Sequence, residues 1–370
     1  MTSKRLIMIK EWNLLRVIAC LSIVFLHSTT QTGNLIGFPN SQYYELLRIL
    51  LCYATPTFII LSEMILANRY SNQLPNQFWQ KRLKWIYVPF LVFAVIDAII
   101  VKQLYSNIDL QKKMLSNVFL GSYEGYFILI ILQFYVLHYF VIRFNIPMRV
   151  LVPISMVVMG FHLYLLNTNI PFVQEYKTEL KLPFTAWFGY FTIAFLMGRY
   201  YKIISKKLFK YRWYTILGLI GSIFIVYFSY KSGIVGVNSR RMDLFPLTIS
   251  ISLTIMAWGQ AVPNLRIINL ISKYSLGIYL VHWQVQRYIA PYTVEWFNQT
   301  ITQVFGLFLI TLLITITIIY LISLLPFGSY IVGKTTNPKE EKKLELHLPW
   351  SIKKTHNINT NTDIKFVKKY

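Results

Sequence analysis

The sequence predicts an all-α, polytopic membrane protein with about ten transmembrane helices. The chain of 370 residues is 55% hydrophobic and 16% aromatic, which is more apolar than is usual for a soluble protein of this length. Apolar runs of about 20 residues, long enough to cross ~30 Å of hydrocarbon as a helix, recur along almost the whole sequence. The connections between these runs are short, so any chemistry is expected to lie among the helices.

The expected helices follow the apolar runs, and their ends are placed to within a few residues. The predicted spans are 14–33, 44–66, 85–103, 123–142, 149–166, 184–201, 213–230, 243–260, 268–288 and 301–325. The first span follows Lys4, Arg5 and Lys10 and is similar to a secretory signal, but no small-residue cleavage site follows it. Residues 1–33 are therefore expected to remain in the mature protein.

The positions of Lys and Arg predict the orientation in the membrane. If the N-terminus is inside, the expected cytoplasmic loops are rich in basic residues, above all 199–212, whereas the outer loop 34–43 has none. By the positive-inside rule both termini are then cytoplasmic. This rule and a basic tail account for most of the net charge of +23, so nucleic-acid binding is not expected.

Two regions are expected along the chain. Residues 1–335 form one transmembrane domain, and residues 336–370 form a polar, basic cytoplasmic tail that is flexible and weakly attracted to anionic lipid. Cys20 and Cys52 both fall inside predicted helices, and no metal-ligand spacing of Cys or His is present. Neither a structural disulfide nor a metal centre is therefore expected, and no bound cofactor.

Arg16 and His27 stand at the two ends of the apolar run RVIACLSIVFLH. Ionisable side chains in hydrocarbon cost at least ~2.5 kcal/mol, which makes them candidate functional residues. Their spacing of eleven residues is close to three helical turns, so both lie on one face about 16 Å apart. Arg16 is expected to hold the phosphate of an acyl thioester, and His27 to act as general base. The alternatives are an anchoring arginine and a histidine that only packs between helices.

A second cluster lies in the second and third spans. Ser62 and Glu63 follow a proline that opens the second span, and Arg82 and Lys84 begin the third span, where an anionic donor would arrive. We expect Glu63 to pair with Arg16 or Arg82, and all four residues of the cluster to serve donor binding. Ordinary positive-inside topology explains Arg82 and Lys84 equally well.

A third cluster is expected on the outer, acceptor side. Tyr279 and His282 are three residues apart and share a helix face, so they form a possible second proton-handling site. Glu124 and Tyr126 begin the fourth span, where an aromatic ring can stack on a sugar. An interfacial belt of aromatic residues is the alternative for both pairs. Asp97, His138 and Arg287 are further ionisable residues in or near predicted spans, without an assigned role.

Several segments, in this order, resemble the membrane-bound acyltransferase-3 family. They are the Arg16–His27 pair, TPTFIILS before QKRLKWIYVPF, YEGYFILIILQFYVL, WFGYFTIAFLMGRYY and YSLGIYLVH, and together they extend over about residues 10–333. The resemblance implies that Arg16 and His27 are the family's essential pair and that Arg82 matches its basic residue at the third span. Asn13 departs from the family pattern where many members have an acid, and Glu63 replaces a common glycine.

Within the family, ATPTFIILSEMI, NVFLGSYEGYFILIILQFYVL and SYIVGK are most similar to members associated with poly-β-1,6-N-acetyl-D-glucosamine, a biofilm exopolysaccharide. This resemblance implies an integral O-acyltransferase of a bacterial cell membrane. It would transfer a succinyl or acetyl group from acyl-CoA, or a similar co-substrate, to the surface polysaccharide. Expected partners are that acceptor, membrane lipid and a membrane glycosyltransferase.

Two other functions stay open at this point. The chain is alternatively an exporter of the same polysaccharide, although it shows no repeated halves and few polar residues at mid-membrane depth. A purely structural partner of a glycosyltransferase would leave the intramembrane charges without a purpose.

Overall fold

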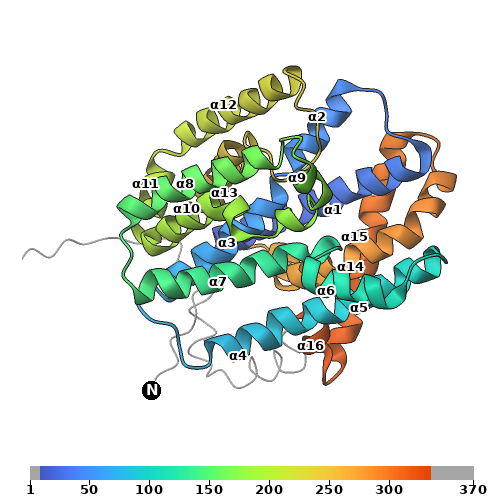
Figure 1. The fold of residues 1–370 in the computed structure, drawn as a ribbon, viewed down its shortest axis with the longest axis horizontal. Helices are drawn as coiled ribbons and strands as arrows, with labels where there is room; N and C mark the ends of the chain where they lie inside the picture. Colours follow the sequence, from blue (N-terminus) through green and yellow to red (C-terminus); the bar gives the residue numbers. More distant parts are fainter. Residues whose placement is uncertain (1–8, 335–370) are drawn as a thin grey trace, which may run out of the picture.

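The computed structural model describes residues 9–334, and within this range the chain forms helices without a single strand (Figure 1). The prediction of an all-α chain is confirmed for this part. The predicted tail at 336–370, and Lys4 and Arg5, lie outside the described residues. The α-helices are α1 (Lys10–Ile36), α2 (Gln42–Leu51), α3 (Ala54–Arg69), α4 (Phe78–Arg82), α5 (Val88–Leu104), α6 (Leu110–Leu120), α7 (Phe127–Arg143), α8 (Met148–Leu165), α9 (Pro171–Glu175), α10 (Phe188–Arg199), α11 (Tyr201–Lys210), α12 (Arg212–Lys231), α13 (Leu244–Gly259), α14 (Arg266–Trp296), α15 (Thr300–Leu324) and α16 (Gly328–Val332).

Seven segments of residues 9–334 are long and apolar enough to cross a membrane, as judged by length and composition. The predicted runs 184–201, 243–260 and 268–288 are not among them. In the first two, α10 has 12 residues and α13 has 16, which is shorter than the ~20 residues that a membrane requires. The third falls in α14, which is long but carries many polar residues. The count of ten spans stays a prediction, as does the side on which each terminus lies.

Helix α1 lies at the centre of the bundle. It packs against α3, α13, α14 and α15, so its polar side chains face other helices instead of lipid. By contrast, α8, α12 and α15 expose large apolar side chains. Examples, one from each helix, are Val157, Leu217 and Leu313, with exposed fractions of 71%, 65% and 69%. Such surfaces are those expected to contact hydrocarbon.

Helices α1 and α14 run side by side in the same direction. Side-chain hydrogen bonds join four pairs of residues that are separated by 255 to 258 residues along the chain, and a further bond runs from Ser272 to Asn13. Because the numbers of the partners rise together, the two helices are parallel. The pairs are Asn13 with Asn269, Arg16 with Ser272, His27 with His282, and Ser28 with Gln286. Arg16 and His27 therefore both face α14, as their spacing predicts.

Helix α10 approaches α3 very closely at Gly198. A Cβ atom at this position would lie 2.2 Å from the carbonyl oxygen of Met64, so a glycine is required for the approach. The amide of Asn68 at the end of α3 also donates a hydrogen bond of 3.1 Å to the carbonyl oxygen of Gly198. This contact fixes α3, the helix that carries Ser62 and Glu63, against α10.

A π-helical turn, η1 (Leu83–Tyr87), joins α4 to α5. The backbone N–H of Val88 donates to the carbonyl of Leu83, five residues back. Pro89, the next residue, has no N–H with which to return to the α-helical pattern. Lys84 lies within the turn and Arg82 directly before it. The π turn therefore shifts the register of α5 relative to α4 at the point where Lys84 lies.

Candidate active site

His27 and His282 form a buried pair between α1 and α14. Nδ1 of His27 lies 2.8 Å from Nε2 of His282, and the two rings are almost parallel at 9°. Nδ1 of His282 lies 3.0 Å from the carbonyl oxygen of Ile278, one turn back in the same helix. The sequence predicted a separate proton-handling site at His282, whereas the fold brings this residue into contact with His27.

The hydrogen-bond partners assign the tautomers of this pair when both rings are neutral. A carbonyl oxygen only accepts, so Nδ1–H of His282 donates to Ile278 and Nε2 of His282 must accept. His27 then donates through Nδ1–H, which leaves Nε2 of His27 with a free lone pair. That is the arrangement of a general base whose orientation is set by a second group.

Glu124 faces the free nitrogen of His27. Its Oε2 lies 3.5 Å from Nε2 of His27, and the Glu124 side chain is 30% exposed whereas that of His27 is 11% exposed. Glu124 belongs to the short 3₁₀ helix η2 (Glu124–Tyr126), whose backbone is held because the Tyr279 hydroxyl donates to the carbonyl of Glu124. Trp283 packs edge-on against His27 at 4.8 Å between ring centroids. Thus Glu124 and His282, both predicted for the acceptor side, contact His27, and Tyr279 contacts both of them.

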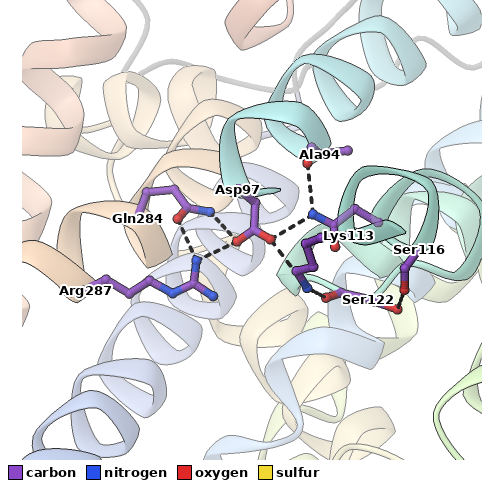
Figure 2. A network of polar contacts seen from close by, with 8 residues as sticks. Ala94, Asp97, Lys113, Ser116, Ser122, Gln284 and Arg287 are labelled. Carbon is purple, nitrogen blue, oxygen red and sulfur yellow. Dashed lines mark hydrogen bonds and ion pairs between the residues drawn. The ribbon is translucent and has the colours of Figure 1, made fainter. Parts of the chain in front are cut away.

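A network of polar contacts around Asp97 adjoins this site (Figure 2). Asp97 on α5 is fully buried and accepts from Arg287 at 2.6 Å and from Gln284 at 2.9 Å, both on α14. On its other side, Asn117 of α6 donates at 2.8 Å and the Lys113 ammonium lies 3.8 Å away. The carboxylate therefore ties α5, α6 and α14 together next to the histidine pair.

The charges around Glu124 are mostly positive. Arg287 and Lys181 lie close enough to attract its carboxylate, and Asp97 opposes them. Lys181, in the loop segment η3 (Glu179–Lys181), places its ammonium 4.6 Å from the ring centroid of Tyr126. Burial lowers the pKa of Lys181, and Glu124 counteracts this shift. Tyr126, predicted for sugar stacking, therefore already has a cation over its ring.

At the other end of the site, neutral side chains hold Arg16. Its Nη1 donates to the Ser272 hydroxyl at 2.9 Å and to the Asn13 side-chain oxygen at 3.4 Å. Asn13 also accepts from Ser272 at 3.0 Å. Within residues 9–334 no carboxylate forms an ion pair with Arg16. Asn13 provides an amide where many family members are expected to have an acid. The positive charge of Arg16 therefore stays available for an anion.

Arg16 is the first of three arginines that influence one another in sequence. Arg69, the last residue of α3, is close enough for electrostatic repulsion with Arg16, and Arg82 in turn repels Arg69. The Arg82 guanidinium lies 5.0 Å from the ring centroids of both Phe78 and Tyr135. Lys84 instead sits 4.6 Å from the Trp85 and Tyr330 rings. From the sequence, Arg69 indicated only the orientation of the chain in the membrane and was not predicted as a site residue, because a basic residue at a helix end is ordinary in a membrane protein.

The prediction that Glu63 pairs with Arg16 or Arg82 is wrong. Glu63 contacts neither Arg16 nor Arg82 but lies 2.7 Å from Nδ1 of His138 on α7, and both side chains are fully buried. Nε2 of His138 faces the carbonyl oxygen of Tyr70 at 3.1 Å. Ser62, the neighbour of Glu63, lies 3.3 Å from the Tyr135 hydroxyl and so does reach the ring under Arg82. A charge in a membrane needs a partner, but helix spacing alone does not reveal which distant helix supplies it.

Comparison with known proteins identifies the relatives of this chain. A family model described as an acyltransferase domain matches residues 9–322. A protein of Bacillus subtilis named as the membrane-bound acyltransferase YfiQ is 31% identical over 90% of this chain and 97% of its own length. Proteins of Staphylococcus aureus and Staphylococcus epidermidis, named as poly-β-1,6-N-acetyl-D-glucosamine export proteins, are 25% identical over 75% of this chain, and over 83% and 81% of their own lengths. No solved structure matches. The predicted resemblance is confirmed.

Proposed function

The chain belongs to the acyltransferase-3 family, and on this premise we propose that it is an integral membrane O-acyltransferase of the bacterial cell. The hydrogen bond from His27 to His282 carries the proposal, because it leaves Nε2 of His27 unprotonated and directed toward Glu124. A hydroxyl that enters beside Glu124 meets this base. The co-substrate is an acyl thioester such as acyl-CoA.

The proposed reaction is general base catalysis of acyl transfer. Nε2 of His27 takes the proton of the acceptor hydroxyl while the hydroxyl oxygen attacks the thioester carbonyl carbon. The C–S bond breaks, and the proton on His27 passes to the leaving thiolate, so that an ester and a thiol are formed and His27 becomes neutral again. Glu124, 3.5 Å away, stabilises the imidazolium that exists between these steps.

The donor is proposed to bind at the arginine end. A phosphate-bearing thioester needs cations that are not already neutralised, and Arg16, Arg69 and Arg82 meet this need. About 16 Å separate two positions eleven residues apart on one helix face, which suits a long donor with its phosphates near Arg16 and its acyl group near His27. Lys84 and Ser62 are assigned to the same end, and Glu63 supports it through His138.

The acceptor is proposed to be poly-β-1,6-N-acetyl-D-glucosamine in biofilm formation, and the transferred group succinyl or acetyl. The support is the names of the staphylococcal relatives, which refer to this polysaccharide. Those names describe export, so an exporter of the same polymer is the second candidate function. The two functions differ in what the loss of His27 does to the polymer.

The test is His27→Ala, made at normal levels in cells that synthesise the polymer. The matched control is His162→Ala, because His162 bonds to Leu180 and Thr185 away from the histidine pair. An acyltransferase leaves unesterified polymer at the cell surface when His27 is lost. An exporter instead leaves polymer inside the cell. Ester content that matches the His162→Ala control in amount and location contradicts the role of His27 in either function.

A further inference from the structure

A groove on the surface lies where α11, α12 and α13 meet, away from the histidine pair and from Arg16. Its volume is about 340 Å³, within the range of ~300–1,000 Å³ that is common for small-molecule sites. In Figure 1, α11 and α12 lie on the other side of the bundle from α15. Most of the lining is aliphatic or aromatic, and the residues used below are Ile204, Lys207, Thr215, Gly218, Ser250 and Leu253.

One border of the groove is strongly basic. Helix α11 carries four exposed lysines, of which Lys207 lines the groove itself. The sequence contains no Asp or Glu from residue 180 to residue 242, so no carboxylate adjoins these lysines along the chain. Glu11 of α1 does reach α11, where it accepts a hydrogen bond from the Tyr201 hydroxyl and not from a lysine. Lys207 also has no ion-pair partner among residues 9–334. The four lysines are Lys202, Lys206, Lys207 and Lys210.

The groove lies at one end of a segment that is long and apolar enough to cross a membrane. It contacts α12 in the first two turns, and α12 is one of the seven segments able to cross a membrane. Trp213 and Tyr214 in the same turns are 66% and 70% exposed, which is typical of aromatic residues at a membrane interface. From these aromatic residues we infer that the basic border faces the lipid head groups and that the apolar wall continues toward the acyl chains.

On the side of the groove formed by α12, Gly218 leaves space because it has no side chain. A Cβ atom placed there would meet only the Ser250 hydroxyl, at 3.8 Å, so the helices do not need a glycine in order to pack. The Thr254 hydroxyl donates to the carbonyl of Thr215 at 3.1 Å and holds α13 next to α12 without closing the space. The absence of a side chain at position 218 leaves a shallow channel along the helix.

We propose that this groove binds an anionic phospholipid. Its phosphate lies against Lys207 and the neighbouring lysines of α11, and one acyl chain lies over Gly218 between α12 and α13. An uncompensated row of lysines attracts anionic lipid, and an apolar groove that opens toward the membrane suits an acyl chain. A second copy of this chain is disfavoured as occupant, because two basic borders of the same charge would then face and repel each other.

The experiment measures lipid binding to the purified full-length protein in detergent by native mass spectrometry. Phosphatidylglycerol and phosphatidylcholine with identical acyl chains are compared. The wild type is expected to bind phosphatidylglycerol at least fivefold more tightly. Lys207→Gln is expected to lose about fivefold of this preference, whereas Lys112→Gln, an exposed lysine of α6, retains it.

The acyl-chain wall is tested separately with Gly218→Leu, which fills the groove and weakens the binding of both lipids. Gly221→Leu is its matched control, because Gly221 is exposed on the same helix, a Cβ atom placed there would have no neighbour within 4 Å, and the residue does not line the groove. If Gly218→Leu fails to fold, Ser250→Leu fills the groove from α13. Equal affinity of the wild type for the two lipids overturns the proposal. So do equal effects of the two glycine variants, or a dimer that only Gly218→Leu disrupts.

Discussion

The two ends of α1 hold their ionisable groups in different ways. At the His27 end, the side chains satisfy one another: His27 pairs with His282 and faces Glu124, and Asp97 pairs with Arg287. At the Arg16 end, the cation is held by hydroxyl and amide groups, and Arg69 lies close enough to repel it. In the reaction that we propose, the first end would transfer the proton, and the positive charge of the second end would bind the anionic donor.

This difference predicts two kinds of kinetic defect. A substitution of His27 removes an interaction needed only in the transition state, so it is expected to lower kcat. Damage at the Arg16 end removes a contact to the donor that exists before reaction, so it raises the KM for the donor.

The largest effect is expected for His27→Gln. A positioned general base contributes roughly 10²- to 10⁴-fold to the rate, so kcat for acyl transfer falls by about this factor while donor KM changes little. The measurement is the initial rate of ester formation with purified protein. His162→Gln serves as the control, and a fall in kcat of less than about tenfold contradicts a base at position 27.

The second largest effect is expected on the free energy of unfolding of the variant Asp97→Ala. Asp97→Ala leaves Arg287 and Lys113 without their carboxylate. Loss of one partner of a buried ion pair costs ~3–5 kcal/mol, and we expect about 3 kcal/mol because the cationic side chains remain 18% and 21% exposed. The thermal midpoint in detergent is the measurement. The double variant with Arg287→Gln should recover part of the loss, and a midpoint equal to wild type contradicts the structural role of the network.

Arg16→Gln is expected to have an intermediate effect. A hydrogen bond to a charged group is worth ~1.5–3 kcal/mol, which corresponds to a rise of about 10- to 150-fold in donor KM. Arg16→Lys keeps the charge but not the planar fork, so its KM should lie between those of wild type and Arg16→Gln. A defect confined to kcat would instead place Arg16 with the catalytic end.

The smallest effect is expected for Arg69→Gln. Arg69 is exposed, and exposed charges contribute up to about 1 kcal/mol, or a few-fold in donor KM. This effect should diminish as salt screens the charge. The KM at low and high ionic strength is the measurement. An effect as large as that of Arg16→Gln, and independent of salt, would make Arg69 a direct ligand of the donor.

The helix face that Arg16 and His27 share was predictable from the sequence, whereas the contacts between distant helices were not. The spacing of Arg16 and His27 placed both on one helix face, and both indeed face α14. The partner of Glu63 was predicted wrongly, since His138 is 75 residues away on another helix. Asp97, Arg287 and Lys113 form one network that their separate positions in the sequence did not indicate.

By itself, the sequence determined the helical class, the buried charges and the common face of Arg16 and His27, because these depend on composition and on the 3.6-residue repeat of one helix. Only the tertiary structure decided that His282 orients His27, that Glu124 faces its free nitrogen, and that His138 is the partner of Glu63. These contacts join helices far apart along the chain. Their geometry depends on the order in which helices pack and on close approaches such as Gly198 against Met64, which no local pattern records.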